Sequence, residues 1–208
     1  MFLDHLSYAL PSRQTWLNFL GRIAFPLFAF QLTEGYTHTR DFNKYALRLA
    51  IFAILSQYPF SLLMRMTGGS QATLNIFFTL LIGLLAIRAY DVLPCKVAVA
   101  AGVLIASEVA TLIHTDYGQW GVLLIFALYI TRENRFSQGC AMLLMVLLRY
   151  GFDILNTGVF NWFALGVMLS YIFILLYNGE RGIKVKYLLY AFYPLHIFLL
   201  YLIHQIIA

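Results

Sequence analysis

The sequence predicts an all-α integral membrane protein, a polytopic helical bundle of about nine transmembrane segments of which the first is short. Hydrophobic side chains make up 62% of the 208 residues and charged ones 11%, whereas a soluble domain carries roughly 25% charged residues. The mean hydropathy is +0.78, and the apolar residues form long runs without the alternation of strands. Because helices satisfy all their backbone hydrogen bonds within lipid, helical spans are the expected elements.

Eight hydrophobic segments approach the roughly 20 residues that a helix needs to cross a hydrocarbon core of about 30 Å. In chain order they are Thr15–Thr37, Asn43–Met64, Leu74–Tyr90, Cys95–His114, Tyr117–Ile130, Ser137–Tyr150, Gly158–Tyr177 and Tyr187–Ala208. A ninth segment, Met1–Leu10, precedes them and reaches only about 15 Å at 1.5 Å per residue, which is half a span. Since no long linker or repeat separates the segments, we expect residues 1–208 to form a single transmembrane domain.

The basic residues predict how these spans are oriented, because Lys and Arg are retained on the cytoplasmic side. If the first segment runs outward, ten basic residues lie on the cytoplasmic side, three lie outside and Arg22 lies within a span. The cytoplasmic set is Arg40, Lys44, Arg48, Arg88, Lys96, Arg132, Arg135, Arg181, Lys184 and Lys186, and the outer set is Arg13, Arg65 and Arg149. We therefore expect a multi-pass protein with an extracytoplasmic C-terminus.

The net charge of +5 does not indicate a nucleic-acid partner, because the Lys and Arg residues are scattered between apolar segments and form no basic stripe. The sequence also lacks a His-Glu-x-x-His motif, a cysteine cluster, a Gly-rich phosphate loop and a Gly-x-Ser-x-Gly motif. These absences argue against a zinc peptidase, a P-loop enzyme and a serine hydrolase. We expect no metal site.

Ionisable residues inside spans are costly, by at least about 2.5 to 3.5 kcal/mol each, and here they gather at one depth. His5, Arg22 and Glu108 each lie about 9 to 10 Å from the outer end of their segment. Further polar residues occupy the outer ends of other spans, namely Asn75, Asp116, Tyr117, Arg149 and Asp153. A polar cavity that opens outward would collect them all.

Helix geometry predicts which of the polar side chains face one another. Asp4 and His5 are adjacent and point about 100° apart, so we expect Asp4 to pair with Arg22 on the next helix while His5 faces the cavity. Tyr193 and His196 are three residues apart and share a helix face.

Each of these residues also has a simpler interpretation. Arg22 could extend its stem to the membrane surface, although Pro26 frees the Arg22 carbonyl and thereby favours a polar interior. His196 could be a core histidine that donates to a nearby carbonyl. Glu108 could be a buried, protonated acid.

Longer motifs run through nearly the whole chain. The most specific are the Gly-Arg-x-Ala-Phe-Pro run that begins at Gly21 and the Phe-Tyr-Pro-x-His run that ends at His196. Others are Asp4-His5, Glu34-Gly35, His38-Thr39-Arg40, Lys44-Tyr45, Arg48-Leu49, Ser56-Gln57-Tyr58-Pro59, Leu74-Asn75, Thr79, Gly83 and Asp116-Tyr117-Gly118. In this combination the chain resembles the TraX family of bacterial inner-membrane proteins, which includes the pilin N-acetylase of the F plasmid.

The resemblance implies an inner-membrane acetyltransferase that moves acetyl from cytosolic acetyl-CoA to an acceptor amine or hydroxyl, with the N-terminus of pilin as one candidate. It implies His5 as general base, Arg22 as electrostatic support and His196 as a second catalytic or orienting group. The other candidates are substrate-binding residues (Asp4, Glu34, Asn75, Glu108, Tyr117 and Tyr193) and binders of the CoA phosphates (His38, Arg40 and Arg48).

Two other classes of function stay open from the sequence. A proton-coupled carrier could use Arg22, Glu108 and His196 as a relay, and it would show flux in proteoliposomes under a pH gradient. Carriers, however, usually show paired repeats with broken helices at the midplane, which this sequence lacks. A membrane assembly factor without chemistry would tolerate replacement of His5 and His196 with no loss of phenotype.

Overall fold

The computed structural model describes residues 1–10, 14–180 and 186–207, and every regular element within them is a helix. In chain order the elements are α1 (Phe2–Ala9), α2 (Thr15–Gly21), α3 (Ala24–Thr37), α4 (Phe42–Thr67), α5 (Ile76–Val92), α6 (Lys96–Leu112), α7 (Gly118–Ile130), α8 (Arg135–Val146), the π-helix η1 (Leu147–Gly151), α9 (Phe152–Thr157), α10 (Trp162–Leu176) and α11 (Lys186–Ile207). Short polar side chains begin several of them by accepting a backbone N–H of the first turn: Asp41, Asn75, Asn134 and Asn161.

Helices occupy all the segments in which the sequence predicts them, including the short first one. The predicted segment Ser137–Tyr150 corresponds to α8 followed by η1, and the chain stays helical through α9 to Thr157. The extra backbone residue per turn in η1 changes the direction in which the following side chains point. The all-helical prediction is therefore confirmed for the described residues.

The predicted first full span is broken in two. α2 ends where the Arg22 N–H meets the carbonyls of Asn18 and Phe19, and α3 begins two residues later. Pro26 lies in the first turn of α3, where its missing N–H costs no hydrogen bond. The break therefore places Arg22 at a helix end, with its backbone carbonyl outside regular helical bonding.

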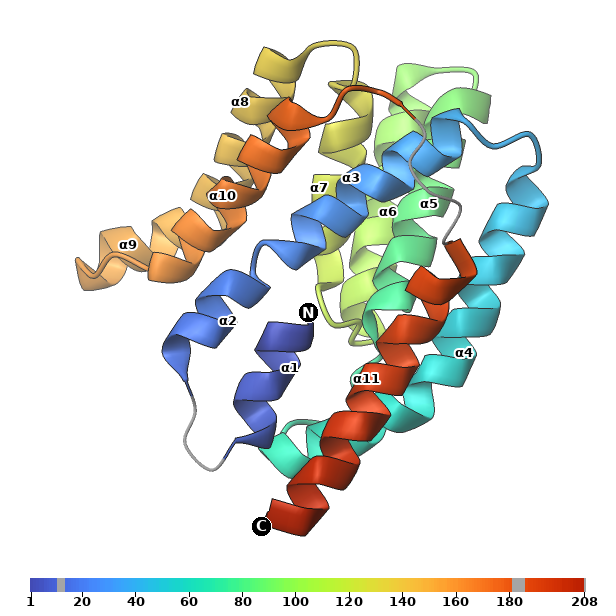
Figure 1. The fold of residues 1–208 in the computed structure, drawn as a ribbon. Coiled ribbons are helices and arrows are strands. Elements are labelled where there is room, and N and C mark those ends of the chain that lie inside the picture. Colours follow the sequence, from blue (N-terminus) through green and yellow to red (C-terminus); the bar gives the residue numbers. More distant parts are fainter. Residues whose placement is uncertain (11–13, 181–185, 208) are drawn as a thin grey trace.

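Figure 1 shows how the helices pack. α11 lies along α4, and α5, α6 and α7 pack on one another beside them. α1 lies between α2 and α11, while α8 and α10 form a pair that extends away from the other helices. The central core takes side chains from seven helices, α3, α4, α5, α7, α8, α10 and α11, and includes Phe25, Leu49, Leu80, Leu124 and Ile197.

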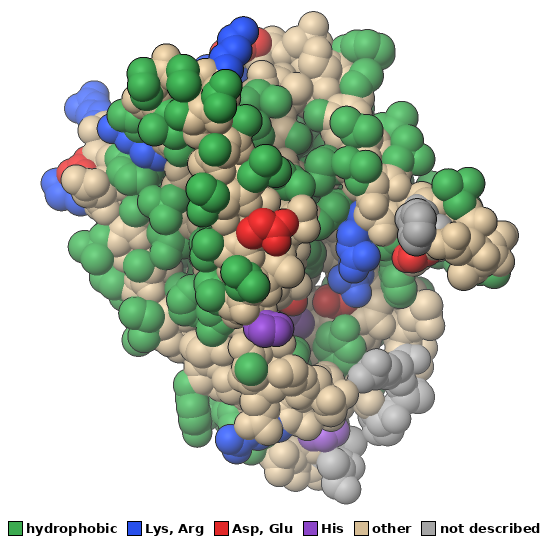
Figure 2. Space-filling view, turned by 180° about the vertical axis from the view of Figure 1, so that it is seen from behind, with side chains coloured by type: hydrophobic (Ala, Val, Ile, Leu, Met, Phe, Trp, Pro, Cys, Tyr) green, Lys and Arg blue, Asp and Glu red, His purple; other side chains and the backbone are tan. Residues whose placement is uncertain are grey.

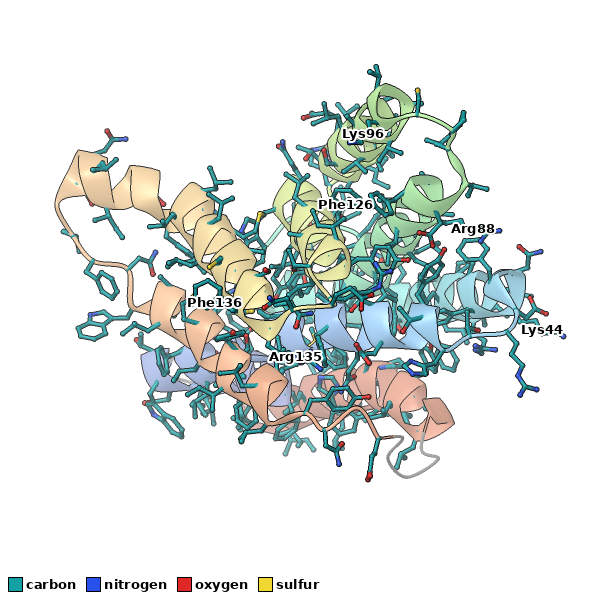
Figure 3. The ribbon with its side chains drawn as sticks, turned by 90° about the horizontal axis from the view of Figure 1, so that it is seen from above. Lys44, Arg88, Lys96, Phe126, Arg135 and Phe136 are labelled. Atoms are coloured by element: carbon teal, nitrogen blue, oxygen red, sulfur yellow. The ribbon has the colours of Figure 1, made fainter. Side chains whose placement is uncertain are left out.

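The connections α3–α4, α5–α6 and α7–α8 all lie at one end of the bundle, at the top of Figure 1. Seen from that end in Figure 3, four helices present basic side chains, namely Lys44, Arg88, Lys96 and Arg135. All four belong to the set that the sequence predicts on the cytoplasmic side. Arg13, Arg181 and Lys184 lie outside the described residues, and the orientation of the bundle in a membrane stays a prediction.

Two helices are long and apolar enough to cross a membrane by length and composition, namely α4 and the Leu188–Ile206 part of α11. Other predicted spans are shorter, with 13 residues in α7 and 15 in α10. Large apolar side chains nevertheless stay exposed along α4, α6, α10 and α11. Figure 2 shows apolar side chains over much of one face, around a hollow that contains charged and histidine side chains. These features indicate membrane association.

Candidate functional site

Two buried histidines from opposite ends of the chain meet inside the bundle. His5 on α1 and His196 on α11 are each 4% exposed, and His5 Nδ1 lies 2.9 Å from His196 Nε2. Their rings stack with centroids 5.1 Å apart and planes inclined by 9°. We call these two residues the histidine pair. It joins two of the three side chains that the sequence analysis names as catalytic.

The hydrogen bonds of His196 define where the histidine pair carries its protons. A backbone carbonyl can only accept, so His196 Nδ1, which lies 2.6 Å from the Phe192 oxygen, carries a hydrogen. In neutral His196 the other nitrogen, Nε2, is then the acceptor for His5 Nδ1–H. The lone pair on His5 Nε2 is left to take a proton. His5 is therefore the basic member, and His196 orients it.

Aromatic side chains enclose the histidine pair. The Tyr193 ring meets both imidazoles edge-on, with centroids 5.9 Å from His5 and 5.7 Å from His196. Phe2 and Phe192 pack on His196 with centroid separations of 6.0 and 4.8 Å. The predicted common face of Tyr193 and His196 is confirmed. This apolar shell fixes the ring orientations and strengthens the hydrogen bond between them.

Asn18 holds the short helix α1 against α2. Its Nδ2 donates to Asp4 Oδ1 at 2.8 Å and to Ser7 Oγ at 2.6 Å. Gly21 allows the close approach, because a Cβ at that position would lie 2.4 Å from the Cβ of Asp4. The predicted Asp4–Arg22 ion pair is wrong, since no such pair forms within 4.0 Å. The side-chain amide of Asn18 takes that carboxylate instead.

An apolar cavity of about 190 Å³ lies between α3, α4, α5 and α11 and is lined by His196 but not by His5, so the prediction that His5 faces a cavity is not confirmed. His196 and Leu189 both line it, and seven residues of helix separate them, which corresponds to about 10 Å along α11. Its wall also contains Met1, Phe28, Gln31, Leu32, Tyr45, Leu49, Ile76, Phe77, Leu80, Tyr190, Phe192 and Tyr193. The cavity thus offers an apolar passage that ends on an imidazole.

Arg22 lines a different cavity, of about 100 Å³, which we call the arginine pocket. Its lining residues are Arg22, Phe25, Pro26, Asp116, Tyr117, Trp120, Arg149, Tyr150 and Val167. The guanidinium of Arg22 lies over the Phe163 ring, 5.1 Å from its centroid, and its buried Nε has no hydrogen-bond partner among the described residues. The prediction that one cavity collects the polar residues is therefore wrong. The helix break places Arg22 beside a space that Tyr117 also lines and that is separate from the one that His196 lines.

A third cavity, of about 720 Å³, lies where the C-terminal ends of α3, α5 and α7 converge, and we call it the polar basin. Its lining comprises Glu34, Tyr36, Thr37, His38, Thr39, Arg40, Phe42, Arg88, Asp91, Tyr129, Arg132 and Glu133. At its base Asp91 accepts hydrogen bonds from the hydroxyls of Tyr36 at 2.5 Å and Tyr129 at 2.9 Å. These bonds join three helices.

Three arginines line the polar basin together with three carboxylates, those of Glu34, Asp91 and Glu133, and Arg132 lies 3.2 Å from Glu133. Arg88 lies over the Phe42 ring and Arg132 over the Tyr129 ring, at 5.2 and 4.3 Å, while Arg40 is exposed. Of the three predicted phosphate binders, His38 and Arg40 line this basin, but Arg48 does not. Arg48 stacks instead on Tyr45, 5.6 Å from the ring centroid.

Asp41 begins α4 beside the basin. Its Oδ1 accepts the Lys44 backbone N–H at 3.0 Å, and the Lys44 ammonium lies 3.0 Å from Oδ2. These two contacts lower the pKa of the Asp41 carboxyl below its ordinary value. The cap is thus strongest while the carboxyl is ionised.

Three predicted substrate-binding residues lie outside all three cavities, namely Asp4, Asn75 and Glu108. Asn75 is fully buried, where it accepts the Phe77 N–H and donates to Ala53 O and Gln57 Oε1. These bonds occupy the side-chain amide of Asn75 and join α4 to α5. The role of Asn75 is therefore structural. Glu108 is exposed on α6 and lines none of the cavities. The relay proposed for a carrier, Arg22 to Glu108 to His196, is therefore not assembled.

Several residues that shape these sites could not be identified from the sequence. Asn18 is an ordinary polar residue in its segment, and its role appears only when α1 folds back on α2. The ends of spans hold three more such residues, Arg88, Asp91 and Arg132. The positive-inside pattern predicts that the two arginines face the cytoplasm, but it does not predict that all three residues line one cavity. Among the described residues no group of three His, Cys, Asp or Glu side chains could hold a metal ion.

Comparisons with known proteins agree with the motifs. The sequence model of the family described as TraX protein matches residues 1–204. A probable fimbrial assembly protein FimC, serogroup H1, from Dichelobacter nodosus is 31% identical over 222 residues, which cover 96% of this chain and 89% of that protein. No solved structure matches the chain significantly.

Proposed function

The chain belongs to the TraX family, and we propose that it is a membrane acetyltransferase with a role in pilus or fimbria assembly. It would move acetyl from acetyl-CoA to an amine or hydroxyl, with the N-terminus of a pilin as one candidate acceptor. The fimbrial assembly protein to which the chain is similar supports the biological setting. The single observation that carries the chemistry is the hydrogen-bonded histidine pair.

In this proposal His5 Nε2 takes the proton of the attacking amine or hydroxyl as the acceptor bonds to the thioester carbonyl. The C–S bond then breaks, and the proton returns from His5 to the departing CoA thiolate, so the pair ends as it began. His196 Nε2 accepts the His5 Nδ1 hydrogen throughout, which keeps Nε2 of His5 basic and fixes its direction. General base catalysis of this kind contributes about 10²- to 10⁴-fold to rate.

Two cavities support the route by which the donor would arrive. The cationic side chains of the polar basin suit the phosphates of CoA, and the apolar cavity suits its uncharged arm. Gln31 lines the apolar cavity and Glu34 lines the basin, one helical turn apart on α3. A donor bound across that turn would direct its thioester toward His196.

We also propose that the remaining helices lie in the bacterial inner membrane, giving about nine segments in one transmembrane domain and an extracytoplasmic C-terminus. The apolar side chains exposed on α6 and α10 support this. A cytoplasm-active reporter fused after Glu133 and an export-active reporter fused after Gly69 should both give activity. Inactivity of both fusions would invert this topology.

The enzymatic proposal is tested with the full chain in lipid nanodiscs. Acetyl-CoA is mixed with peptides that carry a pilin N-terminus, or with amino sugars, and free CoA thiol is measured. We expect CoA release that depends on an acceptor. If the protein neither releases CoA nor binds acetyl-CoA, the proposal is wrong.

A matched control is His204→Gln, since His204 lies outside the three cavities and its ring nitrogen Nδ1 bonds to the Ala9 carbonyl, away from the histidine pair. This variant should retain the activity of the parent protein. A loss as large as that of a histidine-pair variant would show that the assay reports folding and not chemistry.

A further inference from the structure

The arginine pocket brings two guanidinium groups together in one small space. Arg22 and Arg149 line it together with one carboxylate, that of Asp116. In the described part of the chain neither guanidinium forms an ion pair within 4.0 Å, and Asp4 is held by Asn18. The lining therefore has a net charge of about +1 with no contacting counter-charge.

Within the described residues, the arginine pocket contains a buried hydrogen-bond donor without an acceptor, the Nε–H group of Arg22. Its Nε is buried and makes no hydrogen bond within the described residues. An unsatisfied buried donor costs about 1 to 3 kcal/mol, more when it is charged. A bound acceptor atom would remove that cost.

The α10 backbone packs closely on the end of α2 beside the pocket. A Cβ on Gly166 would lie 2.6 Å from the Phe19 carbonyl oxygen and 3.1 Å from the Cβ of Arg22. The π-helix η1 supplies Arg149 and Tyr150, and such irregular turns are frequent at functional sites. The helix break at Arg22 and the irregular turn at Arg149 thus place two guanidinium groups on one small space.

We propose that the arginine pocket binds a small oxyanion, a carboxylate or a phosphate carried by the molecule that the protein modifies. Guanidinium groups bind such anions through paired N–H donors. A volume of about 100 Å³ admits one such group and not a nucleotide. The pocket lies apart from the polar basin, so it would recognise the acceptor and not the donor. The identity of the anion's carrier rests on the proposed function, whereas anion binding itself does not.

Trp120 offers a direct reporter of binding. It lines the pocket, and its Nε1 donates to Met145 O at 2.9 Å, which fixes the indole. The other two tryptophans, Trp16 and Trp162, are 59% and 67% exposed. In the W16F/W162F protein, purified in detergent, Trp120 is the single indole. Titration with inorganic phosphate or acetate, against chloride at equal ionic strength, should change its emission in a saturable manner.

The variants Arg149→Gln and Arg149→Lys distinguish specific binding of the anion in the pocket from a non-specific effect of salt on Trp120 emission. Losing one charge-assisted contact should weaken the phosphate or acetate Kd about tenfold or more, while lysine should recover part of the affinity. Arg65→Gln is the matched control, because Arg65 is an arginine outside the pocket that bonds to Gln71. No saturable response to either anion, or an equal loss in the Arg65 variant, would overturn the proposal.

A further titration identifies the source of the anion. Short-chain phosphatidylglycerol that competes at lower concentration than inorganic phosphate would assign the pocket to a lipid headgroup. Tighter binding of acetate or of a peptide carboxylate would assign it to a protein acceptor. His5→Gln should leave the Trp120 response unchanged, so failure of the acetyltransferase proposal stays distinguishable from failure of this one.

Discussion

The histidine pair lies between α1 and α11, whereas the polar basin lies at the C-terminal ends of α3, α5 and α7, and the two sites differ in how their side chains are held. The pair is buried among aromatic rings, and its hydrogen bonds connect neutral groups in a fixed order. The basin is open, larger and lined by charged side chains from three helix ends. A dry, ordered site suits proton transfer at a defined atom, whereas an open site with exposed arginines suits recognition of an anion that arrives from water.

The largest expected effect is at the histidine pair. His5→Gln keeps a polar side chain of similar length but removes the basic nitrogen, so CoA release should fall by about 10²- to 10⁴-fold. The thermal unfolding midpoint, measured in the same detergent, should change little. If His5→Gln retains more than half of the parent activity, His5 is not the base.

Replacing an arginine of the polar basin should weaken the binding of acetyl-CoA and leave the rate of the chemical step nearly unchanged. Arg88→Gln removes a cation from a solvent-accessible site, so KM for acetyl-CoA should rise about tenfold with kcat nearly unchanged. The difference between parent and variant should shrink at high salt. Steady-state kinetics at two ionic strengths checks this, with Arg65→Gln as control, and a fall in kcat at constant KM would contradict the role of Arg88.

The close approach of α1 to α2 should be sensitive to a single methyl group. Gly21→Ala places a Cβ against Asp4 and should lower the free energy of unfolding by about 1 to 3 kcal/mol. Gly102→Ala is the control, because its added Cβ meets neighbours at 3.4 Å or beyond and alanine favours a helix. Equal effects at the two positions in denaturant titrations would contradict tight packing at Gly21.

The smallest effect is expected at the exposed cap Asp41 beside the basin. Because the folded-state pKa of its carboxyl is lowered, the cap contributes stability above the unfolded-state pKa and loses it as pH falls through the folded-state pKa. Asp41→Asn keeps a good cap without titrating. Thermal unfolding from neutral to strongly acidic pH should therefore show a slightly larger loss in the parent than in the variant.

Hydropathy predicts where the helices run, because their length and apolar runs follow from the demands of lipid. It also predicts that Tyr193 and His196 share a face, since that depends on local helix geometry alone. The depth of a residue along its helix, however, does not determine which way its side chain points. Glu108 lies at the expected height on α6 but faces outward, because the packing of α6 on α5 and α7 selects its buried face.

Contacts between distant segments were the least predictable part. The contact between His5 and His196 joins positions 191 residues apart, so spacing along the chain gives no sign of it. The proposed partner of Asp4 was wrong for a similar reason, because Asn18, one turn before Arg22 on α2, reaches the carboxylate first. Such choices depend on how closely two backbones approach, and at this interface Gly21 sets that distance.

The central claim is that His5 and His196 act as one unit, and a double-mutant cycle tests it most directly. The rate of CoA release is measured for the parent, for His5→Gln, for His196→Gln and for the protein with both changes, all in the same nanodiscs. If His196 works only by orienting His5, the double variant should be no slower than His5→Gln. Losses that multiply in the double variant would show two independent roles and would contradict the account.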